Sequence, residues 1–286
     1  MISVLSKLTL TLALLLGAAY SAACLFLYLR QTRMIFFPVA AIDTTPADFG
    51  VAYEEVWLPL PTHPAERLHG WWIPAPASTE PANVLLYLHG NGVNIGANAA
   101  HAHRFHQMGM AVLLMDYRGY GQSRGNFPSE AAVYEDAEAM WHYLVEQRRV
   151  APEQIFIYGH SLGGAIAIEL ATQHPDAAGL IVQSSFTSIR AMVDRTMNLR
   201  WIPIDLILTQ RFDSLRKVPT LEVPVLFIHG TADAEVPADM SQRLYNAAPD
   251  PKHLWLVPTA GHNNVADTSG MEYFQRVMDL LGRRRG

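Results

Sequence analysis

Apolar and polar positions divide the chain into an N-terminal apolar segment and a longer part in which short apolar runs recur. Residues 8–29 are almost continuously apolar and carry no charge, with Lys7 before them and Arg30 and Arg33 after them. A helix of about 20 apolar residues is long enough to span a bilayer. We therefore predict a single-pass membrane anchor over residues 1–33.

Two other interpretations of this segment stay open. A cleaved signal peptide also carries an apolar run, and Ala22-Ala23 could serve its peptidase. A lipoprotein cleavage site is a weaker match, because the apolar run continues past Cys24. The flanking charges nearly cancel and set no clear orientation. An anchor this close to the start most often leaves the bulk of the chain outside the cytoplasm, so we expect residues 34–286 on the non-cytoplasmic side.

Short apolar runs alternate with amphipathic segments along residues 34–286. The segments 51–58 and 68–73 predict two strands joined by a turn over 61–66. Further runs predict buried strands at Val84–Leu88, Ala111–Met115, Ile155–Tyr158, Leu180–Val182, Val225–Ile228 and Leu254–Val257. Helices are predicted at 97–108, after Ser129 and at 165–171. This alternation indicates an α/β domain with a mostly parallel sheet and helices on both faces.

Residues 184–222 break the alternation. They are rich in arginine and in large apolar residues, namely Phe186, Met192, Met197, Leu199, Trp201, Ile202, Ile204, Leu206, Ile207 and Leu208. The segment is longer than a connection between two strands requires. We predict a small helical cap insertion here, with an ordinary crossover helix and a long loop as the alternative.

Composition excludes several classes of protein. Half of the residues are hydrophobic and 16% are charged, so the chain is not disordered. The net charge of −5 argues against a nucleic-acid partner. A single cysteine, Cys24, leaves no internal disulfide framework and no zinc–thiolate cluster. His101, His103 and His106 lack the i, i+4 spacing of a helical metal site, so we predict no metal and no cofactor. The sequence does not indicate an oligomeric state.

The most informative motif is Gly159-His-Ser-Leu-Gly163. It follows a predicted strand and precedes a predicted helix, which is the pattern of a nucleophile elbow. In so tight a turn, side chains at 159 and 163 would collide with neighbouring backbone, so the chemistry needs glycine at both positions. Ser161 is therefore the candidate nucleophile, and the positive end of the following helix points to where an oxyanion would form.

A serine nucleophile needs a base, and the base needs an acid that holds its tautomer. In α/β sheets such groups follow the carboxyl ends of strands. Asp233 comes after the penultimate predicted strand and is the candidate acid, with Glu235 as an alternative. His262 comes after the last predicted strand and is the candidate base, whereas His253 does not lie at the end of a strand. A turn-capping Asp233 and a surface-loop His262 are the structural alternatives.

Acyl transfer also needs two donors for the oxyanion. The backbone N–H of Leu162, directly after the candidate nucleophile, is one. The loop after an early strand should supply the other. His89-Gly-Asn-Gly follows such a strand, so we assign the backbone N–H of Asn91.

Six motifs in this order resemble the α/β-hydrolase superfamily. They are His89-Gly-Asn-Gly, Asp116-Tyr-Arg-Gly-Tyr-Gly-Gln-Ser-Arg-Gly, Pro128-Ser-Glu, Gly159-His-Ser-Leu-Gly-Gly, His229-Gly-Thr-Ala-Asp and Gly261-His262. More narrowly, residues 34–286 and the anchor look like the membrane-anchored, serine-aminopeptidase-like branch, related to Bem46-type and depalmitoylase-like hydrolases. The resemblance implies an α/β-hydrolase fold, and it implies that Asp116 and Arg118 are structural rather than catalytic.

The residues and the resemblance together predict a serine hydrolase of carboxylic esters or thioesters. Its catalytic residues would be Ser161, Asp233 and His262, and it would act through an acyl-enzyme intermediate. The apolar residues of the predicted cap, close to a membrane, favour a small-molecule or lipid-like acyl substrate. A serine peptidase on the same three residues and a non-catalytic, membrane-tethered scaffold are the alternatives.

Overall fold

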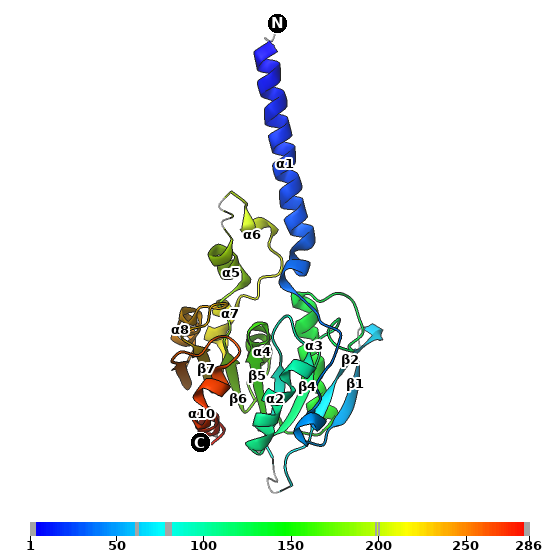
Figure 1. Ribbon diagram of the computed structural model, residues 1–286, viewed down its shortest axis with the longest axis vertical. Coiled ribbons are helices and arrows are strands. Elements are labelled where there is room, and N and C mark those ends of the chain that lie inside the picture. The colour runs from blue at the N-terminus through cyan, green and yellow to red at the C-terminus, as the bar shows by residue number, and fades with distance from the viewer. Residues whose placement is uncertain (1–3, 61–62, 78–81, 198, 200, 283–286) are drawn as a thin grey trace.

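A computed structural model describes residues 4–60, 63–77, 82–197, 199 and 201–282. One long helix, α1 (Val4–Ile35), stands out from a body built on a single sheet (Figure 1). The part Ser6–Ile35 has the length and apolar composition of a membrane span, and its most apolar stretch is not buried by the rest of the chain. The helix is thus a candidate membrane span. That it anchors the protein in a membrane stays a prediction.

Eight strands form one sheet within the described residues, in the order β1-β2-β4-β3-β5-β6-β7-β8. They are β1 (Glu54–Leu60), β2 (His63–Ile73), β3 (Val84–Leu88), β4 (Ala111–Met115), β5 (Ile155–His160), β6 (Gly179–Gln183), β7 (Val225–Gly230) and β8 (Lys252–Val257). β2 pairs antiparallel with β1 and β4, and every other pair is parallel. The mostly parallel sheet predicted from the sequence is confirmed.

The edge hairpin differs from its prediction. The turn expected over 61–66 is too long, because β2 already begins at His63 and residues 61–62 lie outside the described residues. Backbone pairing of Leu60 with His63 and of Pro59 with Arg67 continues the ladder through the polar stretch. An edge strand accepts such residues because one of its faces is open to water, and β1 shows the matching alternation of exposed and buried positions.

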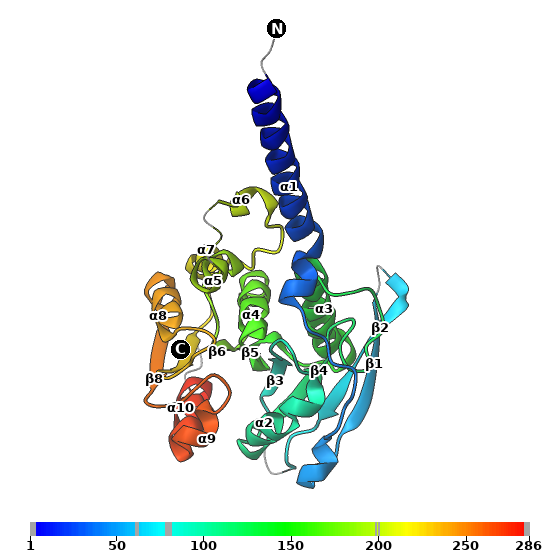
Figure 2. The same cartoon turned by 45° about the horizontal axis from the view of Figure 1, so that its top comes forward.

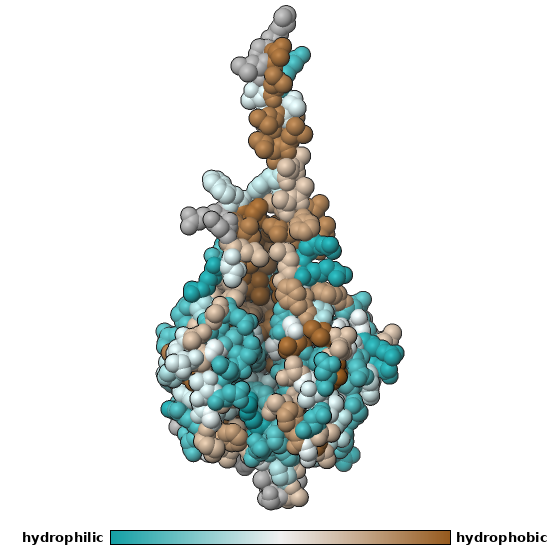
Figure 3. All heavy atoms as spheres, in the orientation of Figure 1, coloured by the Kyte–Doolittle hydropathy of each residue, from teal (hydrophilic) through white to brown (hydrophobic). Residues whose placement is uncertain are grey.

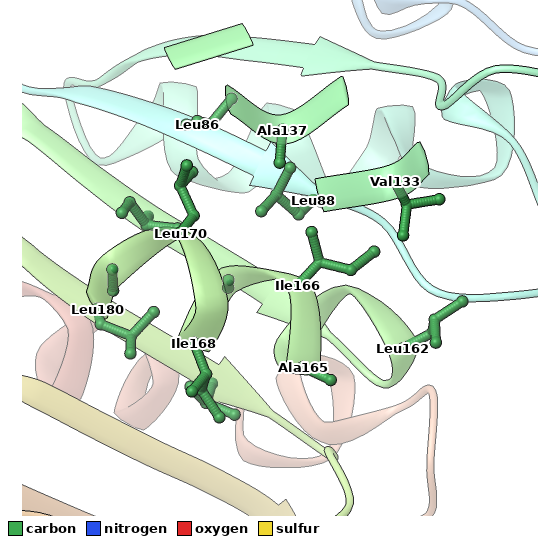
Figure 4. Packing of buried hydrophobic residues seen from close by; sticks show 14 of the residues in the cluster. Leu86, Leu88, Val133, Ala137, Leu162, Ala165, Ile166, Ile168, Leu170 and Leu180 are labelled. Carbon is green, nitrogen blue, oxygen red and sulfur yellow. The ribbon is translucent and has the colours of Figure 1, made fainter. Parts of the chain in front are cut away.

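Helices cover both faces of the sheet. The main ones are α2 (Ile95–Gln107), α3 (Glu130–His142), α4 (Leu162–Gln173), α8 (Ala238–Ala247), α9 (Val265–Ser269) and α10 (Met271–Leu281), and short helical turns are η1 (Pro46–Phe49), η2 (Tyr143–Gln147) and η3 (Pro152–Gln154). Apolar side chains of α3, α4 and α8 form the core on one face, and those of α2, α9 and α10 form it on the other. Strand side chains alternate between the two cores, so Leu86 and Leu88 lie in the same core as Ile166 of α4 (Figure 4).

The segment 184–222, called the cap segment below, contains only short helices in its described part. They are α5 (Ile189–Thr196), α6 (Ile204–Ile207), α7 (Ser214–Lys217) and η4 (Val218–Thr220), while residues 198 and 200 lie outside the description. The segment lies at the α1 end of the body, with α6 beside α1 in two views (Figure 1; Figure 2). The Gln31 side chain of α1 donates to Ile207 O at 3.0 Å and accepts from the N–H of Thr209 at 2.7 Å. The cap segment is therefore fastened to the long helix.

Candidate active site

Ser161 lies on a strained turn between β5 and α4. Its φ of 54° and ψ of −118° fall in a region that residues with side chains rarely adopt. A Cβ on Gly159 would come within 2.2 Å of Gly163 O, and one on Gly163 within 2.1 Å of Leu88 O. Both positions therefore require glycine, as the sequence predicted.

His262 lies on the loop after β8, and its ring is hydrogen-bonded to the carboxylate of Asp233. Nδ1 of His262 is 2.7 Å from Asp233 Oδ2, and their side chains are 7% and 0% exposed. A carboxylate can only accept, so Nδ1 carries the proton and Nε2 is left as a free acceptor. Ser161 and His262 line the same cavity. The arrangement leaves a basic nitrogen available in the cavity that holds the serine.

Asp233 receives several further hydrogen bonds. Oδ1 accepts from the N–H groups of Glu235 and Val236, each at 2.9 Å, and Oδ2 lies 3.1 Å from His229 Nε2. Burial alone would raise the pKa of this carboxyl, but the donors from His229, His262 and Val236 outweigh it and hold the pKa well below its usual range. The group is therefore an anion throughout the physiological pH range.

Glu235, the alternative acid, is placed differently. Its side chain is 65% exposed, and Oε2 lies 4.0 Å from Nε2 of His262. Nε2 is the ring nitrogen that Asp233 leaves free, so Glu235 does not contact the Nδ1–H. The structure thus brings Asp233 and His262 together in the manner expected of an acid and a base, and it places Glu235 at the cavity instead.

His229 was not singled out in the sequence, although it begins the motif His229-Gly-Thr-Ala-Asp at the end of β7. Its side chain is fully buried. Nε2 lies 2.9 Å from Val236 O as well as close to Asp233, and because both partners are acceptors this nitrogen carries the proton. Nδ1 then accepts from the hydroxyl of Ser241 at 2.6 Å. His229 therefore fixes the position of the Asp233 carboxylate.

His160, the variable residue inside the elbow motif, contacts the loop of the candidate base. Its Nε2–H donates to His262 O at 3.1 Å, and the two rings lie 4.9 Å apart. Burial, helped by the neighbouring His262, lowers the pKa of His160 to about 4. The ring is therefore neutral at pH 7 and holds the His262 backbone by a hydrogen bond.

The loop after β3 passes directly beside the candidate nucleophile. A Cβ on Gly90 would lie 3.3 Å from Ser161 Cβ, and the next residue, Asn91, lines the cavity together with Leu162. The structure thus places both predicted oxyanion residues near Ser161. That their N–H groups bind an oxyanion stays a prediction.

The Asn91 side chain ties this loop to the end of α1. Its Oδ1 accepts from the N–H of Phe37 at 3.0 Å and from the hydroxyl of Tyr120 at 2.7 Å, and its Nδ2 donates to Ile35 O. Oδ1 also accepts from the N–H of Gly92 at 2.9 Å. The contacts with Ile35 and Phe37 could not be predicted from the sequence, because they join segments more than fifty residues apart.

The cavity that contains Ser161 and His262 has a volume of about 800 Å³. Much of its apolar lining comes from α1 and the cap segment, namely from Leu27, Met34, Ile35, Met192, Val193, Met197, Leu199, Ile204, Ile207 and Leu208. The surface view shows hydrophobic side chains in the hollow between the long helix and the body (Figure 3). In the described part of the chain, no group of three or more histidine, cysteine, aspartate or glutamate residues is arranged to hold a metal ion.

Comparisons with known proteins place this geometry in context. Residues 79–215 match the family model described as serine aminopeptidase, S33. The chain is 35% identical over 266 residues to the uncharacterized protein Rv2307c of Mycobacterium tuberculosis, covering 91% of this chain and 90% of that protein. It is 32% identical over 267 residues to the protein bem46 of Schizosaccharomyces pombe, covering 90% and 87%.

Solved structures show the same fold. The Pyrococcus furiosus esterase Pf2001 superimposes with a TM-score of 0.71 at 22% identity, over 88% of this chain and 98% of that one. A puromycin-hydrolyzing peptidase of Mycobacterium tuberculosis superimposes with a TM-score of 0.68 at 20% identity, over 82% of this chain and 40% of that one. Esterases and peptidases are thus both among the structural neighbours.

Proposed function

Because this chain belongs to the α/β-hydrolase superfamily and is related to bem46, we propose that it is a serine hydrolase that cleaves carboxylic ester or thioester bonds. The observation that carries the proposal is the 2.7 Å hydrogen bond between His262 Nδ1 and Asp233, with His262 lining the same cavity as a serine on a strained turn. It supplies a base of fixed tautomer in the cavity that contains a candidate nucleophile.

In the proposed mechanism Ser161 Oγ attacks the acyl carbon while His262 Nε2 takes its proton. The N–H groups of Leu162 and Asn91 stabilise the oxyanion that forms. The bond from the acyl carbon to the leaving oxygen or sulfur then breaks, and His262 returns the proton to the leaving alcohol or thiol. Water repeats the attack on the acyl-enzyme, releasing the carboxylic acid and restoring Ser161. Asp233 stabilises the imidazolium in both steps.

A serine peptidase on the same residues is the second candidate. The family model carries an aminopeptidase description, and the exposed carboxylate of Glu235 near His262 could pair with a protonated amino terminus. The apolar walls of the cavity favour the ester or thioester instead, because an acyl chain gains from burial there.

Active-site labelling and substrate turnover separate these candidates. We expect a fluorophosphonate probe to label the wild type and not Ser161→Ala, and we expect the wild type to hydrolyse 4-nitrophenyl butyrate. Cleavage of alanine 4-nitroanilide without ester turnover would favour the peptidase. A wild type that takes no label would remove both candidates and leave the non-catalytic scaffold.

We also propose that residues 1–33 anchor the hydrolase domain, residues 34–286, to a membrane by a single pass, with the cap segment as part of that domain. The domain is proposed to lie on the non-cytoplasmic side. Protease treatment of sealed inside-out and right-side-out vesicles tests the orientation, and digestion of the domain from the cytoplasmic side would contradict it. Recovery of the chain in the soluble fraction after an alkaline wash would contradict the anchor.

A further inference from the structure

The last turns of α1 form part of the cavity wall. Leu27, Gln31, Met34 and Ile35 line the cavity, and their spacing of i, i+4, i+7 and i+8 puts them on one face of the helix. The apolar run that is long enough to span a bilayer ends at Leu29, within this set. The cavity of the candidate nucleophile therefore shares a wall with the candidate membrane span, at the level where a bilayer would end.

The tip of the cap segment reaches farther along the same helix. The hydroxyl of Tyr20 donates to Trp201 O at 2.7 Å. Tyr20 lies inside the apolar run, ten residues before Arg30, which is about 15 Å along a helix. The cap tip thus lies beside a part of α1 that a bilayer would surround.

The side chains at this tip are apolar and uncovered. Trp201 is 88% exposed and Leu206 is 84% exposed. Large apolar side chains exposed to this degree mark contact surfaces. Both residues belong to the part of the cap segment that lies beside α1, where a bilayer around α1 would cover them.

We propose that the cavity is loaded from the bilayer, through the seam between α1 and the cap segment, and that the substrate is a membrane-resident ester with a long acyl chain. The proposal rests on the proposed serine-hydrolase function. The acyl chain would pass from lipid to the apolar walls and never be exposed to water. The ester group would then lie at Ser161, deeper in the same cavity, whose volume is within the usual ligand-site range of about 300–1,000 Å³.

Two leucines of α1 provide a matched test of the cavity wall. Leu27 lines the cavity, whereas Leu29 is 63% exposed and is not among the lining residues. The full chain is placed in phosphatidylcholine nanodiscs, and kcat/KM is measured for bilayer-resident 4-methylumbelliferyl oleate and for soluble 4-nitrophenyl butyrate. We expect Leu27→Trp to lower the oleate-to-butyrate ratio at least about tenfold, since extra volume blocks the long chain more than the short one. Leu29→Trp should keep the wild-type ratio.

An active wild type whose ratio responds equally to both substitutions, or to neither, would overturn this inference and leave the proposed function intact. A wild type that takes no fluorophosphonate label and hydrolyses neither ester would instead overturn the proposed function, and the substrate assignment with it.

The bilayer contact has its own test, which does not depend on activity. Nanodiscs made with phosphatidylcholine brominated on its acyl chains quench only tryptophans that contact the lipid interior. We expect the wild type to be quenched and Trp201→Phe to lose this quenching, because the other five tryptophans lie on β1, β2, α3 and β8. Equal fractional quenching of the two proteins would overturn the proposed loading route.

Discussion

At the residue scale, Asp233 is the point where the candidate site is most firmly fixed. Its carboxylate accepts from two histidine rings and from two backbone N–H groups. Under the proposed mechanism its task is to keep the proton of His262 on Nδ1, so that Nε2 can act as the base. Any change that removes the negative charge but keeps the shape should spare binding and impair proton transfer.

Asp233→Asn should therefore reduce kcat for 4-nitrophenyl butyrate by about 10⁴, because an amide lets His262 adopt the other tautomer. Glu235→Gln is the matched control and should remain within a few-fold of wild type, since its carboxylate does not contact Nδ1. Steady-state kinetics of the two purified variants check this. The assignment of the acid would be wrong if Glu235→Gln lost the activity and Asp233→Asn kept it.

Asn91 offers a test of a backbone donor through its side chain. The side chain fastens the loop after β3 to Ile35 and Phe37, while the backbone N–H is the proposed oxyanion donor. Asn91→Ala keeps the N–H and releases the loop. We expect kcat to fall about tenfold, less than the 10²–10³ that follows complete loss of a donor, with KM nearly unchanged.

Asn246→Ala, at an exposed position of α8, is the control and should alter neither constant. A rise in KM without a fall in kcat would show that Asn91 binds substrate instead of positioning the loop.

At the scale of elements, the elbow depends on how closely α4 approaches the end of β3. A Cβ at Gly163 would meet Leu88 O at 2.1 Å and His89 O at 2.5 Å, and both atoms are backbone. Gly163→Ala should therefore destabilise the fold by about 3 kcal/mol or more, the upper part of the range for overpacking. For a domain of this size that lowers Tm by roughly 6–12 °C.

Gly261→Ala is the matched control, because the nearest atom to a Cβ there is Asn264 Oδ1 at 3.5 Å, an ordinary contact. Its Tm should stay close to that of the wild type. Tryptophan-fluorescence melts of both variants measure the difference, and equal melting points would contradict the close approach of α4 to β3.

The sequence predicted the central elements well and the peripheral ones poorly, for a physical reason. Val84–Leu88 and Ala111–Met115 were predicted with the observed bounds, because strands buried on both faces are unbroken apolar runs. The cap segment has no such local signature. Its α6 is four residues long, and its position follows from hydrogen bonds to Gln31 of α1, far away in sequence.

In the candidate site, too, some residues could be predicted from the sequence and others could not. Strand ends and short motifs were enough to select Ser161, Asp233 and His262, because the fold dictates where such groups follow a strand. The supporting histidines could not be selected in this way. His160 donates a hydrogen bond to His262, which is 102 positions later in the chain. His229 contacts Asp233 and Val236 only because the loop after β7 folds back over it.

At the scale of the whole molecule, α1 is joined to the rest of the chain at two functional points. Gln31 holds the cap segment, and Ile35 and Phe37 hold the side chain of Asn91 beside the candidate nucleophile. The long helix is thus part of the cavity wall and also supports the loop after β3. A bilayer around α1 would therefore affect both the cavity wall and the position of this loop.

Stability of the whole domain should depend on pH because two histidines are buried without charge. Burial, together with Arg104 and His160, lowers the pKa of His101 to about 3, and burial with His262 lowers that of His160 to about 4. In the unfolded chain both return to about 6.5. At these two sites the unfolded state therefore binds more protons than the folded state between about pH 6.5 and pH 4, so their contribution to stability falls as the pH falls. Asp233, with its lowered pKa, adds to the loss only below the ordinary aspartate pKa of about 4.

The last prediction follows from this loss of stability at low pH. The Tm of the wild type should be highest above about pH 6.5 and decline steadily towards pH 4.5. His101→Gln removes one of the two titrating groups while its amide can still form a hydrogen bond with the hydroxyl of Tyr87, so its decline should be shallower. His142→Gln, at a side chain that is 54% exposed, should follow the wild-type slope. Melting curves recorded at half-unit pH steps measure how Tm depends on pH in each protein. If Tm of His101→Gln declined as steeply as that of the wild type, His101 would take up its proton without unfolding.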